Sequence, residues 1–271
     1  MFFCLTLILF LYTIAFSEKE EADCLKRLFA FILSLAALLF SSAISAFAGE
    51  EAMARDITGL CDFSVYCRTS EKPFLTDKTY ATFWRSTPRG WLRVRSPDDQ
   101  PAAGIYVSWA EIIVDWAIQV PDGEGTWVDL ILSSDDQFFN QFIPLPGLTD
   151  FRLECRTPRG SDKMMSVSEI RVFTQGRLPD WVQGWRRMEG DADLMLLSAH
   201  PDDELLWFGG ALPTYAGERK KKVIVAYMAN TAAVRKSELL DGLWLCGVRD
   251  YPVMGEFRNG FSLSRSEMYK L

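Results

Sequence analysis

The hydrophobic pattern of this 271-residue chain changes its period near residue 193, and this change limits the folds open to it. Before that point, short runs alternate apolar and polar residues, as in residues 114–120, where Val114, Trp116, Ile118 and Val120 share one face. Strict alternation is typical of strands that bury one side only. After residue 193, continuous apolar strands alternate with helical segments, which is typical of a parallel sheet. The sequence therefore predicts two regions of different class.

The first region, residues 55 to 175, reads as a succession of short strands. We expect strands at residues 91–95, 105–109, 114–120, 127–132, 151–156 and 168–173. Turn signals at 88–90, 97–99, 121–123 and 144–147 (Pro-Leu-Pro-Gly) separate them. This pattern predicts an antiparallel sandwich. Most of the tryptophans at 84, 91, 109, 116 and 127 should lie in its core, while the alternative is exposed rings that stack on sugars.

The second region has the order strand, helix, strand, helix. We expect strands at 194–199 and 223–228, and helices at 203–217 and 232–246, which together form a parallel sheet with right-handed crossovers. Residues 176–190 carry Gly, Pro and mixed charge and serve as the junction. Lys220-Lys221-Lys222 reads as a solvated charge run between a helix and a strand.

The only histidine, His200, stands at the exit of the first parallel strand. It begins the run His200-Pro201-Asp202-Asp203-Glu204, which gathers one imidazole and three carboxylates where open α/β sheets place their sites. Such a donor set suits a metal ion. The alternative is that these acids only cap the following helix and interact with its dipole.

This segment resembles the signature of the PIG-L/LmbE-like zinc-dependent N-acetylglucosaminyl de-N-acetylases, a strand ending in Ala-His-Pro-Asp-Asp-Glu and a helix with Gly-Gly. The resemblance covers about residues 193 to 271. It implies that His200 and Asp203 bind Zn²⁺, that Asp202 is the general base, and that Arg235 faces an N-acetylated amino-sugar substrate. For Arg235, an ion pair with Glu238 on the same helix is the alternative.

The family's third zinc ligand is a second histidine, which this chain lacks. A catalytic zinc site normally has three protein ligands and an open position. We therefore expect the chain to be a fragment or to use another ligand, to bind zinc weakly and to hydrolyse amides poorly.

The earlier region resembles discoidin-like (coagulation factor type C) galactose-binding jelly rolls. Residues 76–84 (Thr-Asp-Lys-Thr-Tyr-Ala-Thr-Phe-Trp) are similar to the entry of that fold, and residues 167–173 are similar to its closing strand. The resemblance implies a module that binds glycans or surfaces.

The N-terminal segment and the composition bear on location and partners. From Lys26, a basic start, an apolar run and Ala46-Phe47-Ala48 form a secretory signal, with cleavage expected after Ala48. Two membrane helices are the alternative. A net charge of −7 argues against a nucleic-acid partner. Whether Cys61 and Cys67 pair in a disulfide or stay free is open.

We therefore expect a multidomain protein with a signal segment (1–48), an all-β jelly-roll sandwich (49–175), a junction (176–192) and a partial α/β Rossmann-like domain (193–271). The leading functional prediction is an exported zinc-dependent de-N-acetylase, incomplete or inactive in this form. The alternative is a non-catalytic carbohydrate- or cell-surface-binding protein with a vestigial hydrolase domain, so enzymatic activity stays open.

Overall fold

A computed structural model describes residues 52–111, 114–133, 137–229 and 231–257. The expected signal segment and its cleavage site lie outside these ranges. From Met53 onward the chain forms one compact unit. No helix within the described ranges is both long and apolar enough to cross a membrane.

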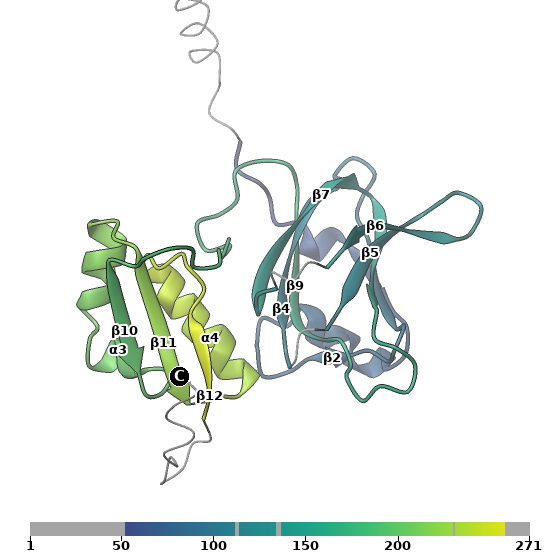
Figure 1. Ribbon diagram of the computed structural model, residues 1–271. Helices are drawn as coiled ribbons and strands as arrows, with labels where there is room; N and C mark the ends of the chain where they lie inside the picture. Colours follow the sequence, from purple (N-terminus) through teal and green to yellow (C-terminus); the bar gives the residue numbers. More distant parts are fainter. Residues whose placement is uncertain (1–51, 112–113, 134–136, 230, 258–271) are drawn as a thin grey trace, which may run out of the picture. The chain divides into compact units, whose positions relative to one another are not determined.

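Two antiparallel sheets form the first part of this unit (Figure 1). The five-stranded sheet has the order β1-β3-β8-β5-β6, and the four-stranded sheet has the order β2-β9-β4-β7. The strands are β1 (Asp62–Val65), β2 (Trp84–Arg85), β3 (Trp91–Arg95), β4 (Ala102–Trp109), β5 (Trp116–Pro121), β6 (Trp127–Leu132), β7 (Asn140–Leu148), β8 (Asp150–Cys155) and β9 (Ser166–Phe173). The 3-10 helices η1 (Thr58–Leu60) and η2 (Thr69–Thr76) flank β1. The predicted sandwich is confirmed.

The core lies between the two sheets. It contains Val114, Trp116 and Ile118, which the alternating pattern placed on one face of their strand. Trp84, Trp109 and Trp116 are buried, which confirms the core prediction for three of the five tryptophans. Trp91 and Trp127 are only half-buried, and the Arg152 guanidinium lies over both rings, 5.6 Å and 4.5 Å from their centroids. The cysteines at 61, 67, 155 and 246 are all free thiols.

One predicted turn is wrong. Pro144-Leu145-Pro146-Gly147 lies inside β7, which pairs with β4 along most of its length. β7 is the last strand of its sheet. An edge strand tolerates proline because the missing N–H can fall on the side that has no neighbour.

A three-stranded parallel sheet forms the second part, with the order β10-β11-β12. Its elements are β10 (Leu194–Ser198), α3 (Asp203–Leu206), the π-helix η3 (Pro213–Glu218), β11 (Val223–Ala229), α4 (Ala233–Leu245) and β12 (Val253–Phe257). The predicted parallel sheet is confirmed, but the predicted helix at 203–217 is broken. Gly209 and Gly210 disfavour helix, and Pro213 cannot donate the bond that would continue it. The domain boundaries stay a prediction.

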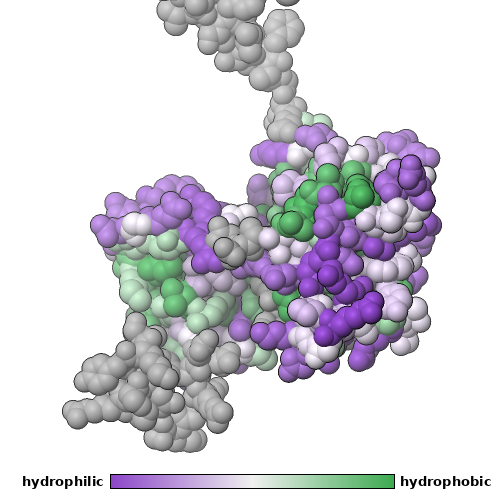
Figure 2. All heavy atoms as spheres, turned by 45° about the vertical axis from the view of Figure 1, so that its right-hand side comes forward, coloured by the Kyte–Doolittle hydropathy of each residue, from purple (hydrophilic) through white to green (hydrophobic). Residues whose placement is uncertain are grey.

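The helices cover only one face of this sheet. Leu196, Val225 and Tyr227 pack with Leu240 and Leu243 of α4. The alternate residues of β10 face the other way, and Met195 and Leu197 are 61% and 53% exposed. Figure 2 shows a hydrophobic patch on this part of the molecule. Two right-handed crossovers that advance in the same direction put both helices on one side, which explains the asymmetry.

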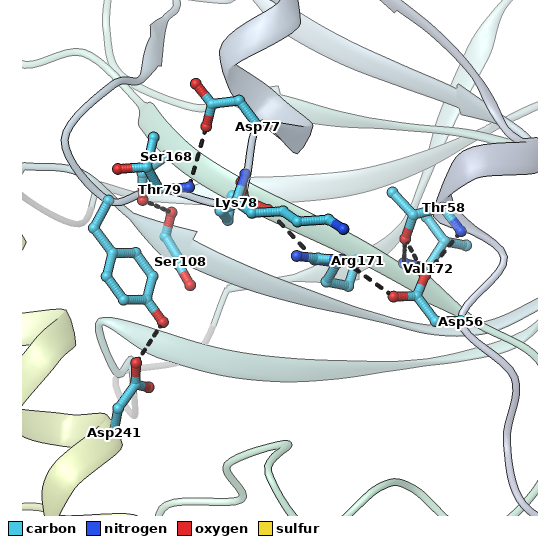
Figure 3. Close-up of polar contacts among 12 residues, drawn as sticks. Asp56, Thr58, Asp77, Lys78, Thr79, Ser108, Ser168, Arg171, Val172 and Asp241 are labelled. Atoms are coloured by element: carbon cyan, nitrogen blue, oxygen red, sulfur yellow. Dashed lines mark hydrogen bonds and ion pairs between the residues drawn. The ribbon is translucent and has the colours of Figure 1, made fainter.

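A partly buried polar network joins the sandwich to α4. The Asp241 carboxylate accepts hydrogen bonds from the Tyr80 hydroxyl (2.9 Å), the Gln183 amide (2.6 Å) and the Asn140 amide (3.4 Å). Figure 3 shows the Asp241 side chain projecting from α4 toward the hydroxyl group with which it forms a hydrogen bond. Burial raises the pKa of Asp241 above its usual range. The two parts are thus connected by hydrogen bonds that neither part can satisfy alone.

Candidate functional site

The loop between β10 and α3 brings two of the predicted site residues together. The ring nitrogen Nδ1 of His200 lies 3.4 Å from Oδ2 of Asp203. The same carboxylate oxygen accepts the His200 backbone N–H at 3.0 Å, and Oδ1 accepts the Trp207 indole N–H at 3.1 Å. The backbone N–H of His200 is the main reason why the pKa of Asp203 lies below its usual range. The carboxylate is therefore held ionised beside the imidazole.

Asp202 points to a different partner. Its Oδ2 lies 2.7 Å from a guanidinium nitrogen of Arg235 on α4, so Arg235 pairs with the loop and not with Glu238 in this structure. Asp202 has φ 113°, a conformation that L-residues rarely adopt. Its backbone N–H donates to the buried Glu204 carboxylate at 3.0 Å. The carboxylates of Asp202 and Asp203 thus face different partners, and their roles as base and zinc ligand stay a prediction.

The metal-ligand set in this region is incomplete. Within the ranges that the structure describes, no group of three or more His, Cys, Asp or Glu side chains could hold a metal ion. His200 and Asp203 supply two donors, whereas a catalytic zinc site normally has three protein ligands. The residues that the structure describes do not make a zinc site by themselves.

A separate hollow of about 350 Å³ opens on the sandwich, between η2 and the residues that lead into β2. Its walls are two phenylalanine rings, two guanidinium groups, a carboxylate and two small side chains: Arg68, Glu71, Phe74, Ala81, Thr82, Phe83 and Arg85. We call it the sandwich hollow. It was not predicted from the sequence, because its walls come from two segments whose contact depends on the fold.

Ion pairs fix the polar side of the sandwich hollow. Arg68 lies 3.0 Å from Oε1 of Glu71, and Oε2 of Glu71 accepts the Arg85 backbone N–H at 3.1 Å. The Arg85 guanidinium pairs with Glu111 and stands 5.3 Å from the centroid of the Phe83 ring. Nε of Arg85 is buried and has no hydrogen-bond partner within the described ranges. The hollow thus offers apolar faces next to oriented donors and acceptors.

The loop that leads into this hollow is itself held by hydrogen bonds. Asp77 accepts the Thr79 backbone N–H at 3.2 Å, as Figure 3 shows, and also the Thr82 hydroxyl. The backbone N–H of Lys78 donates to Glu169 of β9. Burial raises the pKa of Glu169 to about 7, although the bond from Lys78 acts in the opposite direction. These contacts position the segment that the discoidin-like resemblance singled out.

Neither a family model nor a curated protein matches the sequence. Solved structures that resemble part of the chain include CpGH89CBM32-6 produced by Clostridium perfringens, with 10% identity and TM-score 0.37, over 45% of this chain and 100% of that one. A fucose binding module of Streptococcus pneumoniae, SpX-3, has 14% identity and TM-score 0.35, over 45% and 98%. A pectin binding carbohydrate binding module has 15% identity and TM-score 0.34, over 46% and 96%. Identities and TM-scores this low carry no argument about function.

Proposed function

We propose that this protein binds carbohydrate, and that the sandwich hollow holds one sugar ring of a glycan. The observation that carries the proposal is the combination of the Phe74 and Phe83 rings with the Arg68–Glu71 ion pair in a single hollow. The Arg85 backbone N–H donates to the same Glu71 carboxylate and fixes its position. The discoidin-like sequence of residues 76–84, which forms part of its wall, supports the proposal independently.

The chemistry of this hollow suits a sugar. A pyranose ring has an apolar face of C–H groups, which packs on an aromatic ring, and an edge of hydroxyls that both donate and accept. Guanidinium groups can only donate, and an ionised carboxylate can only accept, so Arg85 and Glu71 together can bind neighbouring hydroxyls. A volume of about 350 Å³ lies at the small end of ligand pockets and fits one ring rather than a long chain.

Calorimetric titration with neutral monosaccharides, including galactose, N-acetylgalactosamine, fucose and glucose, tests the proposal. We expect saturable binding of at least one sugar, with a Kd of about 1 mM, the range of single-ring recognition. Arg68→Ala should weaken binding about tenfold, since it removes a charged hydrogen-bond donor.

Arg95→Ala is the matched control. Arg95 is an exposed arginine on β3 that pairs with Asp150 and does not line the hollow. Its loss should leave sugar affinity unchanged. If no sugar binds, or if Arg95→Ala weakens binding as much as Arg68→Ala, the hollow is not a sugar site.

The second candidate is metal-dependent removal of acetyl groups from N-acetylated amino sugars, in a protein that is exported through its N-terminal signal. The approach of His200 to Asp203 and the separate orientation of Asp202 support this candidate, as does the PIG-L/LmbE-like motif. Release of acetate from N-acetylglucosamine conjugates in the presence of Zn²⁺ tests it. Absence of turnover, with sugar binding intact, leaves the binding protein as the function.

A further inference from the structure

A larger hollow lies at the edge of the parallel sheet opposite to His200. Its volume is about 920 Å³, and much of its wall comes from residues that precede the three strands, such as Glu189 before β10, Lys222 before β11 and Asp250 before β12. It therefore opens at the amino ends of the strands, and we call it the basic hollow. Figure 1 shows the amino ends of β10, β11 and β12 at the upper edge of the α/β part. The same upper edge is hydrophilic in Figure 2.

Positive charge dominates its walls. Six cationic side chains face two carboxylates, in a chain whose net charge is −7. The cations are Arg186, Arg187, Lys220, Lys221, Lys222 and Arg249. The repulsion among so many positive charges costs free energy unless an anion neutralises them.

Arg186 and Lys221 form ion pairs with carboxylates, whereas Arg249 is held by neutral groups. Arg186 lies 3.4 Å from Asp250, and Lys221 lies 3.6 Å from Asp193. In contrast, Arg249 donates to the backbone carbonyls of Trp244 (2.7 Å) and Val248 (2.9 Å). Carbonyl oxygens hold a guanidinium in place but carry no net charge to neutralise it. Burial, together with the nearby charge of Arg186, lowers the pKa of Arg249, in keeping with this excess.

Two aromatic side chains, Phe138 and Trp185, also line the hollow, and further aromatic rings pack behind them. Trp185 packs edge-on against Trp244 and Tyr251, with centroids 5.2 Å and 5.7 Å apart. Phe138 packs on Tyr251 at 4.7 Å. The Arg249 guanidinium stacks 3.8 Å from the centroid of Trp244. The hollow thus combines an apolar ring surface with a fixed cationic border.

We propose that the basic hollow is a second binding site, for a multiply charged acidic sugar of one or two rings that carries carboxylate, sulfate or phosphate groups. The volume fits one or two rings, since ligand pockets of about 300–1,000 Å³ enclose small molecules and not polymers. The aromatic wall suits the ring, and lysine and arginine donors suit oxyanions. This site differs from the sandwich hollow in position and in the charge of its ligand. Its existence therefore does not depend on sugar binding in the sandwich hollow.

Titration of the whole chain with three charged probes and one neutral probe tests the inference. The charged probes are a galacturonate disaccharide, a sulfated disaccharide and glucose 6-phosphate, and the neutral probe is lactose. We expect at least one charged probe to saturate with a Kd below about 1 mM, and its affinity to fall at least tenfold in Lys220→Gln/Lys221→Gln. The strongest probe identifies the oxyanion. Lys163→Gln, an exposed lysine outside the hollow, is the matched control and should bind as the unchanged protein does.

The salt dependence supplies a readout that needs no variant. Affinity for the charged probe should fall steadily as NaCl rises from about 0.05 to 0.5 M, since screening weakens ionic attraction. Neutral lactose should bind weakly or not at all in the basic hollow, whatever the salt concentration. The inference is overturned if no charged probe saturates, if salt has no effect, or if the double variant and Lys163→Gln bind alike.

Discussion

Replacing Asp241 with alanine should destabilise the protein, because it removes the acceptor on which three donors converge, two of them from the buried residues Gln183 and Asn140. The Tyr80 hydroxyl, the Gln183 amide and the Asn140 amide lie 2.9, 2.6 and 3.4 Å from the carboxylate oxygens. Alanine leaves these donors inside the protein without that acceptor, and a buried donor left unsatisfied costs about 1–3 kcal/mol.

The size of the effect follows from these contacts. The Asn140 bond is long and Asn140 also reaches the Ser237 carbonyl, so two strong bonds, from Tyr80 and Gln183, dominate. Two donors at about 1.5 kcal/mol each give about 3 kcal/mol. Alanine also removes the cost of burying the Asp241 carboxyl, which the raised pKa reports. The net loss of unfolding free energy should therefore be about 2–3 kcal/mol, within the 5–15 kcal/mol of a typical protein.

Urea unfolding followed by tryptophan fluorescence measures this loss. With a slope of about 2–3 kcal/mol per molar urea, the midpoint should fall by about 1 M. Tyr80→Phe removes one donor and should cost about 1 kcal/mol. Glu238→Ala, at an exposed position one turn earlier on α4, should change stability by less than about 0.5 kcal/mol. If Asp241→Ala and Glu238→Ala unfold at the same midpoint, the network does not stabilise the fold.

Three further outcomes can be measured. Because burial raises the pKa of Glu169 to about 7, its contribution to the free energy of unfolding is largest below about pH 4.5 and is lost as the pH rises through 7. Urea titrations at several pH values should show that Glu169→Gln abolishes this part of the pH dependence. Gly104→Ala should lower the melting temperature in calorimetry, with a loss of about 1–3 kcal/mol, because the new Cβ would lie 2.1 Å from the Phe142 ring. Metal analysis after dialysis against zinc should find little zinc in the unchanged chain, the same amount in Asp202→Asn and less in Asp203→Ala. If Asp202→Asn loses zinc and Asp203→Ala keeps it, the predicted roles of base and ligand are exchanged.

The sequence was most informative where one strand face is buried. The expected strand at 91–95 coincides with β3, where Leu92 and Val94 are buried and their neighbours are not, because alternation marks a strand whatever its partner. The expected strand at 127–132 also coincides with β6, although no residue of β6 is buried. It failed at β7, where prolines indicated a turn, since only the sheet order shows that β7 is an edge strand. It also failed at the helix of 203–217, where Gly209, Gly210 and Pro213 outweigh the apolar pattern.

Candidate sites were predictable only where one short segment carries the chemistry. His200, Asp202 and Asp203 lie within four residues, so their proximity was visible in the sequence. The contact of Arg235 with Asp202 depends instead on the fold, which brings the first turn of α4 to the loop after β10. The basic hollow shows the same limit. Lys220 to Lys222 read as an ordinary solvated run, because Arg186 and Arg249 come from distant segments that only the fold brings to the same edge.

The backbone of Asp202 sets a conformational cost against the carboxylate that the loop displays. A residue other than glycine at φ 113° costs about 1–3 kcal/mol. Glycine would adopt this conformation without that cost, so selection for stability alone favours glycine at this position. Asp202→Gly should therefore relax the loop while it removes the carboxylate that pairs with Arg235. The loop gives up conformational stability in exchange for a charged group at its tip.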